Sequence, residues 1–128
     1  MNADLISLLI VEDDLFIRNL LLEVLGQDYA CTTVATLNEA VRCVRGKAFD
    51  VILLDEHLPD GSGLTLLAVV QTISPDTVVL VMSGKADEDS ICEAKRRGAF
   101  DYLCKPFDLA DLRKRVSVAV AEKVMTAA

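Results

Sequence analysis

Short apolar runs alternate with longer segments of helical periodicity along the whole chain. The apolar runs are typical of strands that are covered on both faces of a sheet. They cover residues 5–11, 51–54 and 78–82, and a weaker strand is predicted over residues 30–34 and a short one over residues 100–104. A helix is predicted after each strand, over residues 15–25, 37–44, 64–73, 87–97 and 109–120, and the one over residues 87–97 is polar and weakly amphipathic. Five strand–helix units of this length predict a doubly wound parallel α/β sheet.

Residues that start or stop helices lie at the expected boundaries. Thr36 and Glu39 have the spacing of a capping box, in which a hydroxyl and a carboxylate satisfy free backbone amides. Asp14 precedes a helical segment and is interpreted as its N-cap, and Gly26 is placed to end that segment. These positions support the predicted helices.

The length and composition fit a single domain with a sizeable core. The chain has 128 residues, of which 52% are hydrophobic and 26% are charged. It contains no internal repeat, low-complexity run or linker. We therefore expect one domain over residues 1–128, with a tail over residues 122–128.

Charge and apolar-run length exclude several classes of protein. Thirteen Lys and Arg against twenty Asp and Glu give a formal net charge of -7, which argues against direct nucleic acid binding because that affinity comes largely from cation–phosphate contacts. No apolar run approaches the roughly 18 residues of a membrane-spanning helix, and the first run lacks the basic flank of a signal peptide. We expect a cytoplasmic protein without a membrane segment. We also expect four reduced, mostly buried thiols, at Cys31, Cys43, Cys92 and Cys104.

Polar residues directly follow four of the predicted strands. Glu12 and Asp13 follow the first strand, Asp55 the third, Ser83 the fourth and Lys105 the fifth. Ligands of such sheets bind beyond the carboxyl ends of the strands. Carboxylates gathered there repel one another unless a cation bridges them, and oxygen ligands favour a hard divalent ion such as Mg²⁺. An ammonium and a hydroxyl nearby suit a phosphoryl group.

The sequence resembles the receiver domain of two-component response regulators over essentially its full length. Four motifs carry the resemblance, and they occupy residues 10–14, 53–64, 82–84 and 98–107. Each motif is weak alone, but together at these spacings they are highly specific. The resemblance implies a five-stranded parallel sheet of order 2-1-3-4-5 with five helices, a flavodoxin-like three-layer sandwich.

The resemblance also implies the chemistry of the site. It makes Asp55 the aspartate that accepts a phosphoryl group. It assigns a Mg²⁺ (or Mn²⁺) ion to Glu12, Asp13, Asp55 and the backbone carbonyl of His57. The first acidic position more often holds Asp than Glu in the family, so Glu12 lengthens one arm of the metal site without abolishing it.

Four further residues receive roles from the resemblance. Ser83 matches the hydroxyl that contacts the phosphoryl group, and Lys105 matches the lysine that pairs with it. The Lys105–Pro106 peptide bond matches a cis bond of the family. Tyr102 matches the aromatic switch that packs inward and repacks the surface of the fourth helix, fifth strand and fifth helix.

The implied partners are a sensor histidine kinase or a His phosphotransfer protein, and a downstream protein target or an output domain. The chain is expected to catalyse only its own phosphorylation and dephosphorylation, without being a turnover enzyme. Residues 98–109 resemble receivers of enhancer-binding transcription activators, and no output motif follows them, so the chain is either a stand-alone receiver or part of a longer regulator. We expect a monomer or a weak phosphorylation-dependent dimer, with Phe100 as a candidate partner contact and Asp101 and Arg115 available for pairing.

Three other functions are compatible with such a sheet. A small phosphatase with an aspartyl nucleophile uses related chemistry, but it usually carries Asp-x-Asp after its first strand, whereas Asp55 follows the third. An FMN-binding protein needs a first loop that accepts phosphate, and Glu12 and Asp13 would repel it. A pseudo-receiver acts only as an interaction module and does not need the five site side chains. The presence of Glu12, Asp13, Asp55, Ser83 and Lys105 therefore argues against this alternative.

Overall fold

A five-stranded parallel sheet forms the centre of the computed structural model, which describes residues 5–85 and 87–127. Its strand order is β2-β1-β3-β6-β7. The strands are β1 (Ser7–Val11), β2 (Ala30–Val34), β3 (Val51–Asp55), β6 (Val78–Ser83) and β7 (Asp101–Cys104). Counted along the chain, these are the five predicted strands in the order 2-1-3-4-5, so the predicted fold class is confirmed.

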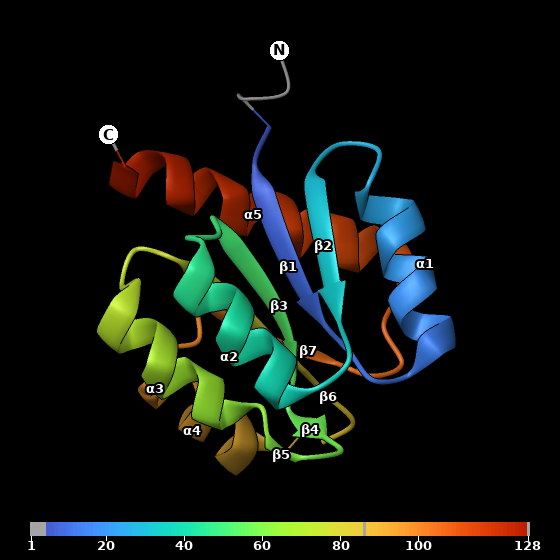
Figure 1. Ribbon diagram of the computed structural model, residues 1–128. Helices are drawn as coiled ribbons and strands as arrows, with labels where there is room; N and C mark the ends of the chain where they lie inside the picture. The colour runs from blue at the N-terminus through green and yellow to red at the C-terminus, as the bar shows by residue number, and fades with distance from the viewer. Residues whose placement is uncertain (1–4, 86, 128) are drawn as a thin grey trace.

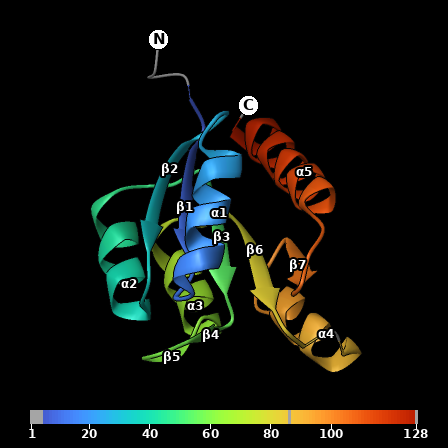
Figure 2. The same cartoon turned by 90° about the vertical axis from the view of Figure 1, so that its right-hand side faces the viewer.

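Helices cover both faces of this sheet, as Figures 1 and 2 show. They are α1 (Leu15–Leu25), α2 (Leu37–Gly46), α3 (Leu64–Ile73), α4 (Glu88–Arg96) and α5 (Leu109–Ala127). Buried residues of α1 and α5 share one core cluster, and buried residues of α2, α3 and α4 share the other. The result is three layers, with α2 and α3 in front of the sheet in Figure 1 and α5 behind it.

The two core clusters meet through the central strands. Leu8 and Ile10 of β1 pack on the side of α1 and α5, whereas Leu9 and Val11 pack on the opposite side. Successive side chains of a strand point to opposite faces, so a strand between two helical layers must be apolar at every position. This explains why β1, β3 and β6 appear in the sequence as continuous apolar runs.

The structure differs from the predicted elements in two places. Residues 57–62, which lie between the third predicted strand and the third predicted helix, contain a small antiparallel hairpin of β4 (His57–Leu58) and β5 (Gly61–Ser62). Residues 122–127, expected to be tail, continue α5 instead. This segment contains no Gly or Pro that would end a helix, and most of its residues favour helix.

The hairpin is tied to α2 by the carboxylate of Asp60. The backbone amides of Leu37 and Asn38 donate to its two oxygens at 2.8 and 2.9 Å. These amides are free because they open a helix, where negative charge is also favoured. The hydrogen bonds from Asn38 and Leu37 lower the pKa of Asp60. Gly61 follows at φ 149°, a conformation that side chains rarely adopt.

The lowered pKa of Asp60 predicts how its contribution depends on pH. A depressed carboxyl pKa stabilises the folded chain above the unfolded-state value, and this stabilisation is lost as pH falls through the folded-state pKa. We expect Asp60→Ala to lower the urea midpoint at pH 7, and we expect its difference from the wild type to shrink as pH falls through the lowered pKa of folded Asp60. The control is Asp28→Ala, at an exposed aspartate between α1 and β2. An equal loss at pH 7 and below that pKa would contradict the prediction.

The cysteines are free, but the expectation that most are buried is wrong. Cys92 is exposed, and Cys31, Cys43 and Cys104 are half-buried. Cys31 and Cys104 lie on β2 and β7, the edge strands of the sheet, and the other two lie on helices with one solvent-facing side. None of the helices in the described part of the chain is both long and apolar enough to span a membrane.

Candidate functional site

The register of the sheet brings the predicted polar residues to one edge. Val11 pairs with Leu54, Asp55 with Met82, and Ser83 with Cys104. All of these positions lie at the carboxyl ends of parallel strands, so the residues that follow them gather at the same edge. This is the edge at which sheets of this kind bind their ligands.

Three carboxylates meet there. Glu12, Asp13 and Asp55 each place one oxygen within 4.8 Å of the others, a spacing suited to a metal ion. Glu12 is fully buried and Asp55 nearly so, while Asp13 is exposed to solvent. The cluster therefore has one open side, and its ligand atoms are the hard oxygens that Mg²⁺ prefers.

Lys105 is the cation of the site. Its Nζ donates to Oε1 of Glu12 at 2.6 Å and to Oδ2 of Asp55 at 3.2 Å. The Lys105–Pro106 peptide bond is cis, and the amide of Lys105 donates to the carbonyl of Ser83 at 2.7 Å. Burial alone would lower the pKa of Lys105, but its hydrogen bond to Glu12 and the charges of Glu12 and Asp55 outweigh burial and raise it.

Both carboxylate oxygens of Glu12 and its backbone carbonyl accept hydrogen bonds. Its Oε2 accepts from the amide of Asp14 at 3.1 Å, and its carbonyl accepts from Arg18 at 3.2 Å. Burial raises the pKa of Glu12 to about 7, with a further contribution from the charge of Asp55, although the Lys105 and Asp14 hydrogen bonds act in the opposite direction. Asp14 also accepts from the amide of Ile17 at 3.0 Å, which confirms that it is the N-cap of α1.

The carboxylate of Asp55 is fixed at both oxygens. Oδ1 accepts from the amide of His57 at 3.2 Å, and Oδ2 accepts from Lys105. The His57 imidazole is 62% exposed, and its Nε2 lies 4.0 Å from Oε2 of Glu56. The side chain of His57 therefore lies mostly in solvent, while its backbone amide contacts Asp55.

Ser83 and Tyr102 lie on the neighbouring strands β6 and β7. Ser83 is fully buried, and its Oγ accepts from the amide of Lys85 at 3.1 Å. Tyr102 is buried too, with its hydroxyl 3.0 Å from Oε1 of Glu56 and 2.9 Å from the carbonyl of Lys85. The tyrosine is thus packed inward against the loop that follows Ser83.

Glu56 and Lys85 were not singled out by the sequence analysis. Glu56 follows Asp55 and looks like an ordinary loop residue, and Lys85 takes part through its backbone, which no side-chain pattern reveals. The contact between Glu56 and Tyr102 joins positions 46 residues apart in the sequence. Only the fold brings them together.

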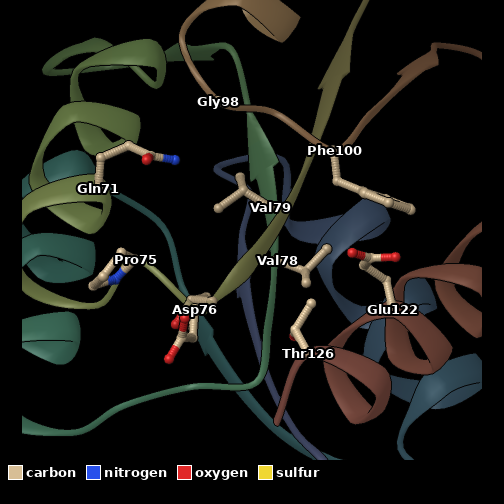
Figure 3. A pocket seen from close by; sticks show the side chains of 10 residues that line it. Gln71, Pro75, Asp76, Val78, Val79, Gly98, Phe100, Glu122 and Thr126 are labelled. Carbon is tan, nitrogen blue, oxygen red and sulfur yellow. The ribbon is translucent and has the colours of Figure 1, made fainter. Parts of the chain in front are cut away.

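A cavity of about 190 Å³ lies away from this site (Figure 3). Val78 opens β6 and Gly98 precedes β7, so the cavity sits at the amino ends of these strands, opposite the acidic cluster. Phe100, predicted as a candidate partner contact, lines it and is 37% exposed. The neighbouring Asp101 pairs with Arg115 at 2.8 Å, within one chain.

The fold and the site together define a class of protein. A doubly wound sheet presents buried carboxylates, a paired lysine and a buried serine at the carboxyl edge of its strands, and these groups suit a divalent metal ion and a phosphoryl group. The family profile described as "Response regulator receiver domain" matches residues 8–117. The chain belongs to this family.

Individual proteins that are similar to the chain include two response regulators and a solved receiver domain. The chain is 40% identical over 113 residues to the response regulator protein PilR of Pseudomonas aeruginosa, covering 88% of this chain and 25% of PilR. It is 36% identical over 118 residues to the transcriptional regulator NtrC of Salmonella typhimurium, covering 91% of this chain and 24% of NtrC. A CheY-like receiver domain protein of Methanospirillum hungatei superposes with a TM-score of 0.90 at 26% identity, covering 96% of this chain and 99% of that one. The chain thus spans about a quarter of the length of these two regulators.

Proposed function

We propose that the chain is the phosphoacceptor receiver of a two-component or phosphorelay system and that Asp55 takes the phosphoryl group. The observation that carries the proposal is the position of Lys105, whose ammonium contacts Asp55 and Glu12 at once. A carboxylate nucleophile, a cation and further carboxylates at one open edge are the parts that phosphoryl transfer requires.

The acidic cluster fits a Mg²⁺ or Mn²⁺ ion. Glu12, Asp13, Asp55 and the backbone carbonyl of His57 would hold it. When bound, the ion neutralises charge on the phosphoryl oxygens and lowers the repulsion between them and the carboxylates. Asp13, exposed on the open side, leaves room for solvent and for an incoming phosphoryl group.

In the transfer step, a carboxylate oxygen of Asp55 attacks phosphorus. The new P–O bond forms as the P–N bond to the donor histidine breaks, and the imidazole nitrogen keeps the electron pair of that bond. Lys105 and Ser83 then supply a cation and a hydroxyl donor to the phosphoryl oxygens, which stabilise the charge that develops there. Hydrolysis of the acyl phosphate by water restores Asp55, so the chain catalyses its own modification and is not a turnover enzyme.

Phosphorylation adds charge beside Ser83. The phosphoryl group carries about 1.5–2 negative charges, so it draws the Ser83 hydroxyl toward it and shifts the loop that ends at Lys85. Tyr102 contacts that loop, and the surface of α4, β7 and α5 repacks with it. Two arrangements with different contacts are what such a switch needs.

The partners follow from this chemistry. A sensor histidine kinase or a His phosphotransfer protein donates the phosphoryl group in the cytoplasm. The switched surface acts on a downstream protein or on an output domain, as the greater length of PilR and NtrC favours. The receiver works as a monomer or as a weak dimer that phosphorylation promotes, and it does not contact nucleic acid itself.

Intact mass after incubation with acetyl phosphate tests the proposal. With Mg²⁺ we expect the wild type to gain one phosphoryl mass, and with EDTA in place of Mg²⁺ no gain. Asp55→Asn should gain nothing in either buffer, because an amide is a far weaker nucleophile than a carboxylate, whereas Asp76→Asn, at the opposite edge of the sheet, should label as the wild type does. A folded wild-type chain that never gains the mass, with several small donors, would support a pseudo-receiver instead.

A further inference from the structure

The hydroxyl of Tyr102 lies within hydrogen-bond distance of two acceptors. Oε1 of Glu56 lies 3.0 Å away and the carbonyl of Lys85 lies 2.9 Å away, and both oxygens are acceptors for its proton. A tyrosine hydroxyl has one proton, so the two acceptors compete for it. Hydrogen bonds to an ionised carboxylate are about twice as strong as those between neutral groups, which favours Glu56.

The two acceptors belong to different parts of the site. Lys85 lies in the loop after β6, and its amide donates to Ser83, so its carbonyl moves with that loop. Glu56 follows β3, and its own amide donates to the carbonyl of Met82 at 2.9 Å, which fixes its backbone against the sheet. Glu56 therefore offers Tyr102 an anchor that does not depend on where the Ser83–Lys85 loop lies.

The surroundings of Glu56 suit this role. Its side chain is only 12% exposed, so water competes weakly for its carboxylate. Oε2, the oxygen that Tyr102 does not use, faces the imidazole of His57 at 4.0 Å. The carboxylate thus lies between a tyrosine hydroxyl and a histidine, with Oε1 directed to the ring on β7.

We propose that Glu56 is a positioning residue of the switch, holding Tyr102 inward through its hydroxyl and biasing the surface of α4 and β7 toward the inward arrangement. The proposal deepens the proposed function and rests on it, because the inward ring has a signalling consequence only in a working receiver. Phosphorylation and the inward ring favour each other by linkage, so a residue that favours the inward ring also favours the phosphorylated chain.

Tyrosine NMR tests the proposal directly. The chain has two tyrosines, Tyr29 and Tyr102, so ring-labelled tyrosine gives two sets of signals, and Tyr29→Phe assigns them. We expect Glu56→Ala to shift the Tyr102 ring toward outward, solvent-like signals, with the inward-to-outward ratio falling by up to about 10-fold, because the Lys85 carbonyl then remains as an acceptor. Glu56→Gln, which keeps the shape and a neutral acceptor oxygen, should give a ratio between those of Glu56→Ala and the wild type.

Two controls separate this effect from general damage. Glu23→Ala, at an exposed glutamate of α1, removes one negative charge and should leave the Tyr102 signals in place. Acetyl phosphate labelling should be slower in Glu56→Ala than in the wild type, whereas adding Glu56→Ala to Tyr102→Phe should change little, because the hydroxyl that Glu56 holds is already missing.

The outcomes for the two proposals are distinct. Tyr102 signals that stay at their wild-type positions in a folded Glu56→Ala chain would overturn the role of Glu56, whatever the labelling shows. The role of Glu56 would also be overturned if Glu56→Ala slowed acetyl phosphate labelling as much in the Tyr102→Phe chain as in the wild type. A wild-type chain that takes no phosphoryl group would instead overturn the proposed function, and the NMR result would still decide whether Glu56 holds the ring.

Discussion

Replacing Lys105 with methionine is expected to slow phosphorylation of Asp55 by about 10²–10³-fold, the usual effect of removing one group that stabilises developing charge. The same change should lower the free energy of unfolding at pH 8 without divalent metal by about 3 kcal/mol, because it leaves buried Glu12 and Asp55 without a cation. The Lys105 side chain is only 20% exposed, so solvent screens the pair weakly.

Initial rates of labelling by acetyl phosphate and urea unfolding curves measure the two effects. Lys114→Met provides the matched control, since Lys114 is an exposed lysine on α5 and its loss should change neither quantity. Labelling of Lys105→Met at the wild-type rate would contradict the role of the ammonium. If Lys105→Met lowered the free energy of unfolding but not the labelling rate, Lys105 would be only a structural counter-ion to Glu12 and Asp55.

We expect Glu12 to make the metal-free chain more stable at mildly acidic pH than above neutral pH. Its pKa is raised from 4.5 to about 7 by burial, so between these values the folded chain binds more protons than the unfolded chain. Stability must then fall as pH rises through this range. At about 1.36 kcal/mol per pKa unit, the fall attributable to Glu12 is about 3 kcal/mol and is complete above pH 7.

Urea unfolding in EDTA between pH 4.5 and 8 checks this dependence. Glu12→Gln, which is neutral at every pH, should flatten the curve across that range. Mg²⁺ requires the ionised carboxylate, so adding it should stabilise the wild type more at pH 8 than at pH 5. A wild-type curve that rises with pH in EDTA would show that pairing with Lys105 outweighs the burial of Glu12.

Much of the fold follows from local pattern. The continuous apolar runs of β1, β3 and β6 exist because both faces of the central sheet are covered, and the capping residues Asp14 and Thr36 act where the sequence places them. The site residues are predictable because parallel strands end at a common edge, so a polar residue that follows an apolar run is a candidate for a site at that edge.

Other features depend on contacts that no local pattern encodes. The β4–β5 hairpin has strands of two residues, too short for any periodicity, and it is anchored by Asp60 to a helix more than twenty positions earlier. Glu56 gains its partner only when β7 lies beside β6. The half-buried cysteines follow from which strands lie at the sheet edges, which is a property of the complete sheet.

The site is complete only when segments from distant parts of the chain have folded together. Lys105 and Glu12 lie 93 positions apart, and Lys105 and Asp55 lie 50 apart. Contacts of such high sequence separation carry a large entropic cost and form only as the overall topology is established. A folding intermediate with one half of the sheet in place would therefore be unable to accept a phosphoryl group, so the chemistry itself can serve as a marker of the completely folded chain.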